Sequence, residues 1–169
     1  MPFSMTPYRV FDSYRSIDPA FFARRGIKLL LCDLDYTLAP KSQPEPDDAL
    51  RRWLSDVQAA GVTVMILSNN RSPVRVERFC RSLGITYEGH AGKPSVRGFR
   101  RAMARCGVTP EQTAMLGDKL LTDMLGANRA GVLPLIVEPL GGPKGAWNRV
   151  LHTLQRPWKA ISRKKHPQR

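Results

Sequence analysis

The most constraining feature of this sequence is a short apolar run that ends in two carboxylates, LLLCDLDYTL at residues 29–38. Four to eight apolar residues bounded by polar ones are typical of a strand buried on both faces of a parallel sheet. Ligands of open α/β sheets bind at the carboxyl ends of the strands, so Asp33 and Asp35 are expected where a substrate can reach them. Taken alone, the same DxDxT pattern is equally typical of an Asp-rich turn.

The rest of the chain alternates between apolar runs and amphipathic segments. Leu50, Trp53, Leu54 and Val57 recur at helical spacing, which predicts one apolar stripe packed against a sheet. Further strands are expected at 62–67, 85–87, 113–116 and 133–137. An alternating βαβαβ series predicts an α/β fold in which a parallel sheet is flanked by helices.

The length of 169 residues suits a single domain with a proper core. We expect an aromatic and proline-rich covering arm at 1–26, a core at 27–140 and a separate basic tail at 141–169. One short helix is expected in the arm, between Pro19 and Gly26. Its phenylalanines and arginines suit either packing on the core or contact with a membrane.

The charge balance is strongly basic, with 27 Lys and Arg against 14 Asp and Glu, or +13. An excess of this size indicates acidic partners, which include nucleic acid, anionic lipid and phosphorylated substrates. The segment from Lys144 to Arg169 holds basic residues and no acidic one. The tail is therefore an electrostatically distinct part of the chain.

The tail also has a helical apolar stripe, formed by Val150, Leu151, Leu154, Trp158 and Ile161. Basic residues lie largely off this stripe, a pattern typical of helices that lie on anionic membranes. The same pattern suits RNA binding or simple packing on the core. The proline at 157 predicts a kink or two helical pieces.

Three cysteines, Cys32, Cys80 and Cys106, lack CxxC spacing and lie in apolar surroundings. Reduced core thiols of a cytosolic protein are the expected interpretation. The sequence has neither an apolar run of about 18 residues nor the pattern of a signal peptide. We therefore expect a cytoplasmic protein.

Polar side chains follow four of the predicted strands. They are Asp33, Asp35, Thr37, Ser68, Asn69, Lys93, Asp118 and Asp123. With right-handed crossovers, the carboxyl ends of parallel strands lie along one edge of the sheet. These residues are therefore expected to converge on one site.

The residue types suit phosphoryl transfer through a covalent aspartyl phosphate. Asp33 is the candidate nucleophile, and Asp35 is placed to act as general acid and base. Mg²⁺ prefers oxygen ligands, which Asp33, Asp118 and the backbone carbonyl of Asp35 would supply. Lys93 and Ser68 would stabilise charge on the phosphoryl oxygens. Each residue alone has an ordinary structural explanation, but their joint order indicates a single phosphoryl-transfer site.

The motifs resemble those of the haloacid dehalogenase (HAD) superfamily: DLDYT, LSN, KP and GDKLLTD, within residues 26–140. The sequence is most similar to the small YqeG-type phosphatases of subfamily IIIA, and it resembles phosphatidylglycerophosphate phosphatases. The resemblance implies a Rossmann-like fold and a Mg²⁺ cofactor. It implies Asp33 and Asp35 as catalytic residues, Thr37, Ser68, Asn69 and Lys93 as phosphate contacts, Asp33, Asp35 and Asp118 as metal ligands, and Asp123 as their support.

Two flanking positions depart from the family pattern. Tyr36 stands where asparagine is common, and Lys119 stands where glutamine is common. Both positions border the motifs, so they bear on substrate preference more than on the chemistry.

The spacing between motifs predicts an open site without a cap domain, because the intervals 38–67 and 70–92 each have room for little more than one helix. A bulky or membrane-embedded substrate, or a second subunit, would then have to exclude water.

We expect a Mg²⁺-dependent phosphatase acting on phosphatidylglycerophosphate, peripheral to the inner face of the membrane. The alternatives are a phosphatase for a soluble or nucleic-acid phosphate, and an RNA- or ribosome-binding scaffold with vestigial catalysis. Intact motif residues argue against the scaffold.

Overall fold

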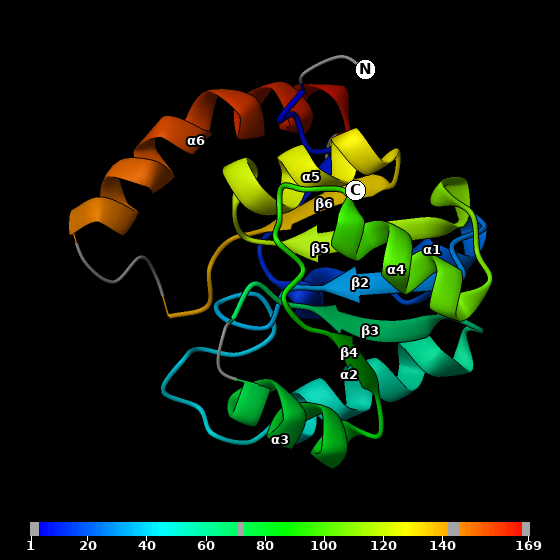
Figure 1. Ribbon diagram of the computed structural model, residues 1–169. Helices are drawn as coiled ribbons and strands as arrows, with labels where there is room; N and C mark the ends of the chain where they lie inside the picture. The colour runs from blue at the N-terminus through cyan, green and yellow to red at the C-terminus, as the bar shows by residue number, and fades with distance from the viewer. Residues whose placement is uncertain (1–3, 71–72, 142–145, 167–169) are drawn as a thin grey trace.

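The computed structural model describes residues 4–70, 73–141 and 146–166. Six strands form one parallel sheet in the order β1-β6-β5-β2-β3-β4 (Figure 1). The strands are β1 (Arg9–Phe11), β2 (Leu29–Cys32), β3 (Thr63–Leu67), β4 (Thr86–Glu88), β5 (Thr113–Gly117) and β6 (Leu133–Val137). The predicted α/β fold with a parallel sheet and flanking helices is confirmed.

Helices cover both faces of the sheet. The α-helices are α1 (Ala20–Arg24), α2 (Asp48–Ala59), α3 (Pro73–Leu83), α4 (Arg97–Cys106), α5 (Leu125–Ala130) and α6 (Ala146–Lys165). A π-helical turn, η3 (Leu120–Met124), leads into α5. Short 3₁₀ turns lie at η1 (Tyr14–Ser16) and η2 (Pro110–Gln112).

The central strand β2 shows how the two faces are filled. Leu30 and Cys32 join a core cluster with residues of α1, α2 and α3, whereas Leu29 and Leu31 join a second cluster with residues of α4 and α5. All four side chains are fully buried. Successive side chains of a strand point to opposite faces, so an uninterrupted apolar run is what a doubly covered strand requires.

The N-terminal arm is packed into the fold. Its strand β1 pairs in parallel with β6, which extends the sheet at one edge. Phe21 and Phe22 of α1 are buried in the core cluster on the α2 side, so these rings pack on the core rather than face outward. The predicted short helix is present, but a strand of three residues is too short to be recognised by periodicity.

The basic tail forms α6, which continues past Pro157 as one helix. The Lys159 ammonium contacts the Glu138 carboxylate at 2.8 Å, and the Ser162 hydroxyl donates a hydrogen bond to the Tyr8 carbonyl at 3.2 Å. The C-terminal half of α6 therefore packs on the core, largely through polar side chains. The side chains of the predicted stripe residues Leu151 and Leu154 lie outside the described residues.

The intervals between the motifs contain no cap domain in the described part of the chain. Between β2 and β3 there is one helix, α2, and between β3 and Lys93 there are α3 and β4. None of the described helices combines the length and the apolar character needed to cross a bilayer.

Candidate active site

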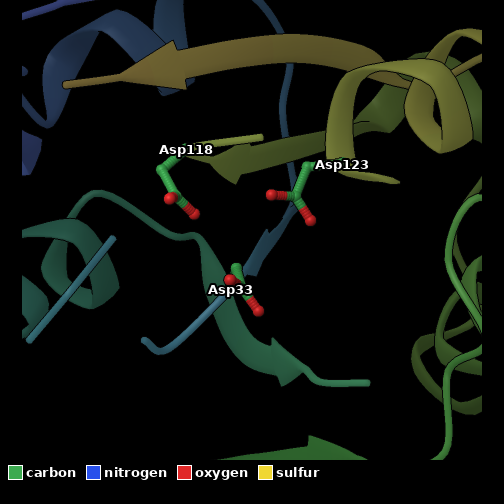
Figure 2. Close-up of side chains that lie close together, drawn as sticks. All are labelled: Asp33, Asp118 and Asp123. Carbon is green, nitrogen blue, oxygen red and sulfur yellow. The ribbon is translucent and has the colours of Figure 1, made fainter. Parts of the chain in front are cut away.

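Three carboxylates meet at the carboxyl edge of the sheet. Asp33 follows β2, Asp118 follows β5 and Asp123 lies in η3, and one oxygen of each lies within 4.8 Å of the others (Figure 2). All three are buried. Gly117 makes this approach possible, because a Cβ atom there would lie 2.4 Å from an Asp123 oxygen.

Two lysines neutralise most of this acidic cluster. The Lys93 ammonium lies 2.9 Å from Asp33 and 2.7 Å from Asp123, and its side chain is 2% exposed. The Lys119 ammonium lies 3.0 Å from Asp118 and 3.5 Å from Asp33. When all three acidic groups are ionised they face only two ammonium groups, and a net negative charge remains that a cation can offset.

The reach of Lys93 into the site is fixed by Asn69. The Lys93 backbone N–H donates to the Asn69 side-chain oxygen at 2.8 Å, and the Asn69 amide nitrogen donates to the Lys93 carbonyl at 2.9 Å. The Asn69 side chain is thus used to hold Lys93. Its predicted contact with phosphate would have to come from its backbone N–H.

The pKa values of Asp33 and Asp118 are shifted in opposite directions, because burial and the two lysines act against each other. Burial acts to raise the pKa of Asp33, but the neighbouring Lys93 and Lys119 outweigh it and lower that pKa. Desolvation by burial raises the pKa of Asp118 to about 7, with Lys119 opposing and Asp33 and Asp123 adding to the shift. Asp33 is therefore held as a carboxylate, as a nucleophile must be.

A pH dependence of stability follows for the metal-free protein. A carboxyl group with a raised pKa stabilises the folded state at low pH and loses this contribution as it ionises. For Asp118 the loss runs from about pH 4, the ordinary pKa of an aspartate, up to its folded pKa of about 7. Urea unfolding in EDTA should show Asp118→Asn gaining stability relative to wild type across this window. A constant difference between the two proteins would contradict the assignment.

Asp35 lies apart from the acidic cluster. Its carboxylate accepts a hydrogen bond from Arg75 Nε at 2.9 Å. The same guanidinium donates to the carbonyls of Pro40 and Gln43 and lies over the Phe79 ring. Arg75 therefore ties both Asp35 and the loop after it to α3. The predicted metal contact of Asp35 would have to come from its backbone carbonyl.

The other predicted site residues take distinct places. The buried Thr37 hydroxyl donates a hydrogen bond to the Asp118 carboxylate at 3.3 Å. This hydrogen bond helps to orient the Asp118 carboxylate. Ser68 lies at the end of β3, where its hydroxyl accepts a hydrogen bond from the Asn70 N–H at 3.0 Å. An open cavity of about 580 Å³ is lined by Asp33, Asp35, Ser68, Asn69 and Lys93.

The same cavity has further lining residues to which the sequence analysis gave no catalytic, phosphate-binding or metal-binding role. They are Tyr36, Lys41, Asn70, Lys119 and Thr122. Lys119 had been noted only as a flanking departure from the family pattern, and its two carboxylate contacts were not foreseen. Arg75 was also missed, because a single arginine in an amphipathic helix gives no sign of its partner 40 residues earlier.

Tyr36 has a left-handed backbone conformation, with φ of 66°. Asparagine tolerates this conformation better than other residues with a side chain, so the family preference noted above has a structural reason. We expect Tyr36→Asn to raise the free energy of unfolding by about 1 kcal/mol, or Tm by about 2–4 °C. Thermal unfolding checks this, with Tyr36→Phe as the matched control. An equal gain in both variants would contradict a backbone origin.

The acidic cluster fits a magnesium ion by its donor set, since Mg²⁺ prefers oxygen ligands. Its three aspartate oxygens lie within 4.8 Å of one another, a limit slightly above the about 4.2 Å between opposite ligands at Mg–O distances of about 2.1 Å, so the carboxylates would have to draw together around the ion. Lys119 contacts Asp33 and Asp118, the two carboxylates predicted to hold the metal. A metal binding there would have to displace its ammonium group.

The fold and the acidic site define a class of protein, and comparison with known families agrees. The chain matches the family described as haloacid dehalogenase-like hydrolase over residues 13–131. It therefore belongs to that family, as the motifs predicted. It is 34% identical over 153 residues to the "Probable phosphatase YqeG" of Bacillus subtilis. This match covers 90% of this chain and 88% of that protein. The chain is accordingly a HAD-type phosphatase, a phosphoric monoester hydrolase.

More distant similarities bear on fold and substrate separately. The chain is 28% identical over 142 residues to "Phosphatidylglycerophosphate phosphatase 1, chloroplastic" of Chlamydomonas reinhardtii, a match that covers 79% of this chain and 53% of that protein. The solved deoxy-D-mannose-octulosonate 8-phosphate phosphatase (YrbI) of Haemophilus influenzae superposes with a TM-score of 0.52. It shares 22% identity over 83% of this chain and 93% of its own. That likeness concerns the fold.

Proposed function

We propose that this phosphatase hydrolyses phosphatidylglycerophosphate with Mg²⁺, through an aspartyl phosphate on Asp33. The main support is the position of Asp33, ionised beside Lys93 in the wall of an open cavity. A carboxylate kept charged and in contact with a buried ammonium group suits nucleophilic attack on phosphorus.

The reaction runs in two displacements. An Asp33 oxygen attacks phosphorus, the bond to the ester oxygen breaks, and the leaving oxygen takes up a proton delivered by the Asp35 carboxyl group as general acid. Water then attacks the aspartyl phosphate while Asp35 takes a proton from it, which releases inorganic phosphate and regenerates Asp33. For both proton transfers the Asp35 carboxyl group has to turn from Arg75 toward the cavity.

The surrounding residues stabilise the transferring group. Lys93, Ser68 and the backbone N–H of Asn69 would offer positive charge and hydrogen bonds to the equatorial phosphoryl oxygens. Asp33, Asp118 and the Asp35 carbonyl would hold a Mg²⁺ ion, which would supply positive charge that offsets the repulsion between phosphate and a carboxylate. Asp123 supports the cluster through Lys93 and the Lys119 N–H.

The substrate assignment rests on the openness and charge of the protein. With no cap in the described intervals, a phosphate on a bulky lipid can reach Asp33 without a lid closing over it. The net charge of +13 favours an anionic surface as a partner. The Chlamydomonas relative acts on this lipid by its name. We accordingly propose a cytoplasmic protein that associates peripherally with the inner face of the membrane.

Phosphate release tests the substrate. Wild type and Asp33→Asn are compared on phosphatidylglycerophosphate in mixed micelles, on an aryl phosphate, and on a panel of sugar, triose and nucleotide phosphates. Rapid turnover of the lipid alone supports the proposal. Preference for a soluble phosphate would overturn the lipid assignment but keep the mechanism, and the relative named "Glyceraldehyde 3-phosphate phosphatase" in Methanothermobacter thermautotrophicus makes a triose phosphate the first competitor to include.

The scaffold alternative has its own outcome in this assay. If no substrate is cleaved faster than by Asp33→Asn, a vestigial site that binds RNA or a ribosomal partner becomes the better hypothesis. The intact contacts among Asp33, Lys93 and Asp123 weigh against it. A pure binding protein has no chemical use for an ammonium group between two carboxylates, and apolar residues of similar volume could replace the whole cluster without loss of stability.

A further inference from the structure

Four large apolar side chains stand out as exposed in the described part of the chain. Val74, Leu121, Val150 and Ile161 are 65%, 53%, 49% and 46% exposed. Single exposed apolar residues are ordinary on protein surfaces. Three of them, Val74, Leu121 and Val150, are relevant here because of where they lie relative to the catalytic cavity.

Val74 lies at the beginning of α3, beside the catalytic cavity. It lines a shallow hollow together with Lys41 and Arg78, and Lys41 also lines the catalytic cavity. The two depressions are therefore adjacent. Val74 therefore lies next to the catalytic cavity without lining it.

Leu121 is a second neighbour of the catalytic cavity. It lies in η3 after the buried Leu120 and directly before Thr122, which lines the catalytic cavity. η3 follows β5, whereas α3 follows β3, and β2 with Asp33 lies between these two strands in the sheet. Val74 and Leu121 thus flank the nucleophile from opposite directions.

Val150 extends the same side of the molecule. Lys159 contacts Glu138 just after β6, and Ser162 contacts Tyr8 just before β1, so α6 runs back along the sheet from its carboxyl edge. At 1.5 Å per residue, Val150 lies about 13 Å before Lys159, on the side of that edge. Figure 1 shows α6 and α3 both beginning on the side toward which the strands point.

Positive charge accompanies these apolar residues. Lys41 is exposed at the cavity mouth, where its ammonium lies 6.0 Å from the Tyr36 ring. Arg78 pairs with Glu45 only at 3.5 Å, with both side chains at least half exposed. An approaching anionic surface therefore meets a cationic, partly apolar rim.

We propose that this rim, defined as Val74, Leu121, Val150 and Lys41, docks on the surface of an anionic lipid bilayer. The inference rests on the proposed function in taking the substrate to be a lipid headgroup. The apolar residues are separate points around a cavity mouth. A protein partner usually requires a packed apolar centre, whereas a fluid bilayer accepts separate apolar points and adds electrostatic attraction. Docking in this orientation presents the cavity to the headgroups.

Vesicle binding tests the rim with the full-length protein. Flotation compares phosphatidylglycerol-containing vesicles with neutral phosphatidylcholine vesicles, for wild type, Val74→Ser/Leu121→Ser and Ile161→Ser. Ile161 is the matched control, because it is similarly exposed but lies where α6 packs over the sheet. We expect wild type and Ile161→Ser to bind anionic vesicles equally, and the double variant to bind at least about tenfold more weakly. Hydrolysis of an aryl phosphate by the double variant should stay at the wild-type level.

Each contrary result has a definite meaning. The proposal is overturned if wild type ignores anionic vesicles, if the double variant binds like wild type, or if Ile161→Ser weakens binding as much as the double variant. It is also overturned if the same substitutions abolish binding to an RNA oligonucleotide instead. If the protein hydrolyses the lipid in detergent micelles but binds no vesicles, the proposed substrate is supported and the docking surface is rejected. Vesicle binding without lipid hydrolysis would leave the rim standing without that substrate.

Discussion

Asp33→Asn is expected to reduce phosphatase turnover at least about 10³-fold, the scale on which the loss of a nucleophile acts. An amide oxygen is a poor nucleophile, and it cannot carry the negative charge that Lys93 and Lys119 stabilise in Asp33. The substitution is nearly isosteric, and Lys93 keeps its contact with Asp123. The fold should therefore survive, and the loss should appear in kcat.

Two measurements separate this chemical loss from a structural one. Thermal unfolding of Asp33→Asn should remain close to that of Asp56→Asn, an exposed aspartate of α2 that serves as control. Rapid quenching with radiolabelled substrate should trap phosphate on wild type in a form that hydroxylamine releases, as expected of an acyl phosphate. If Asp33→Asn retains a tenth of the wild-type turnover, Asp33 is not the nucleophile.

The convergence of the site was predictable because it follows from topology. Asp33, Ser68 and Asp118 each follow a strand, and parallel strands with right-handed crossovers place those ends on one edge. The apolar stripe at Leu50, Trp53, Leu54 and Val57 likewise lies within α2, and the four side chains are buried. Asp47 caps that helix by accepting a hydrogen bond from the Leu50 N–H at 2.8 Å.

What the sequence did not reveal are partnerships made by long side chains across the fold. Arg75 and Asp35 meet only because α3 packs beside the loop after β2, and many arginines of this basic chain are equivalent by sequence alone. Lys119 likewise had to be seen beside its carboxylates. The inner face of α6 was foreseen only in part. Trp158 of the expected stripe packs on the second core cluster, whereas Val150 and Ile161 are exposed and Gln155, Lys159 and Ser162 are buried.

Two of the lysines at the site each contact two carboxylates and offset their charge. Lys93 is shared by Asp33 and Asp123, and Lys119 is shared by Asp33 and Asp118. The two lysines differ in burial, since 2% of the Lys93 side chain and 42% of the Lys119 side chain are exposed. Lys119 can therefore move aside for a metal at little cost, whereas Lys93 is a fixed part of the core.

Lys93→Met is expected to lower the free energy of unfolding by about 3 kcal/mol, because removing one partner of a buried ion pair leaves charges uncompensated. Here two carboxylates, Asp33 and Asp123, lose their common ammonium group. Methionine fills a similar volume, so the loss of charge rather than a cavity dominates the effect. Urea unfolding in EDTA measures it, with Lys28→Met, an exposed lysine before β2, as the control.

Magnesium distinguishes this charge effect from a general packing defect. A divalent cation at the acidic cluster replaces part of the charge lost with Lys93, so Mg²⁺ should raise the Tm of Lys93→Met by more than it raises that of wild type or Lys28→Met. Turnover should stay low even with Mg²⁺, because phosphate loses its buried cationic partner. Equal stability of Lys93→Met and Lys28→Met would show that the carboxylates do not depend on Lys93, and it would remove the electrostatic basis for an ionised nucleophile at Asp33.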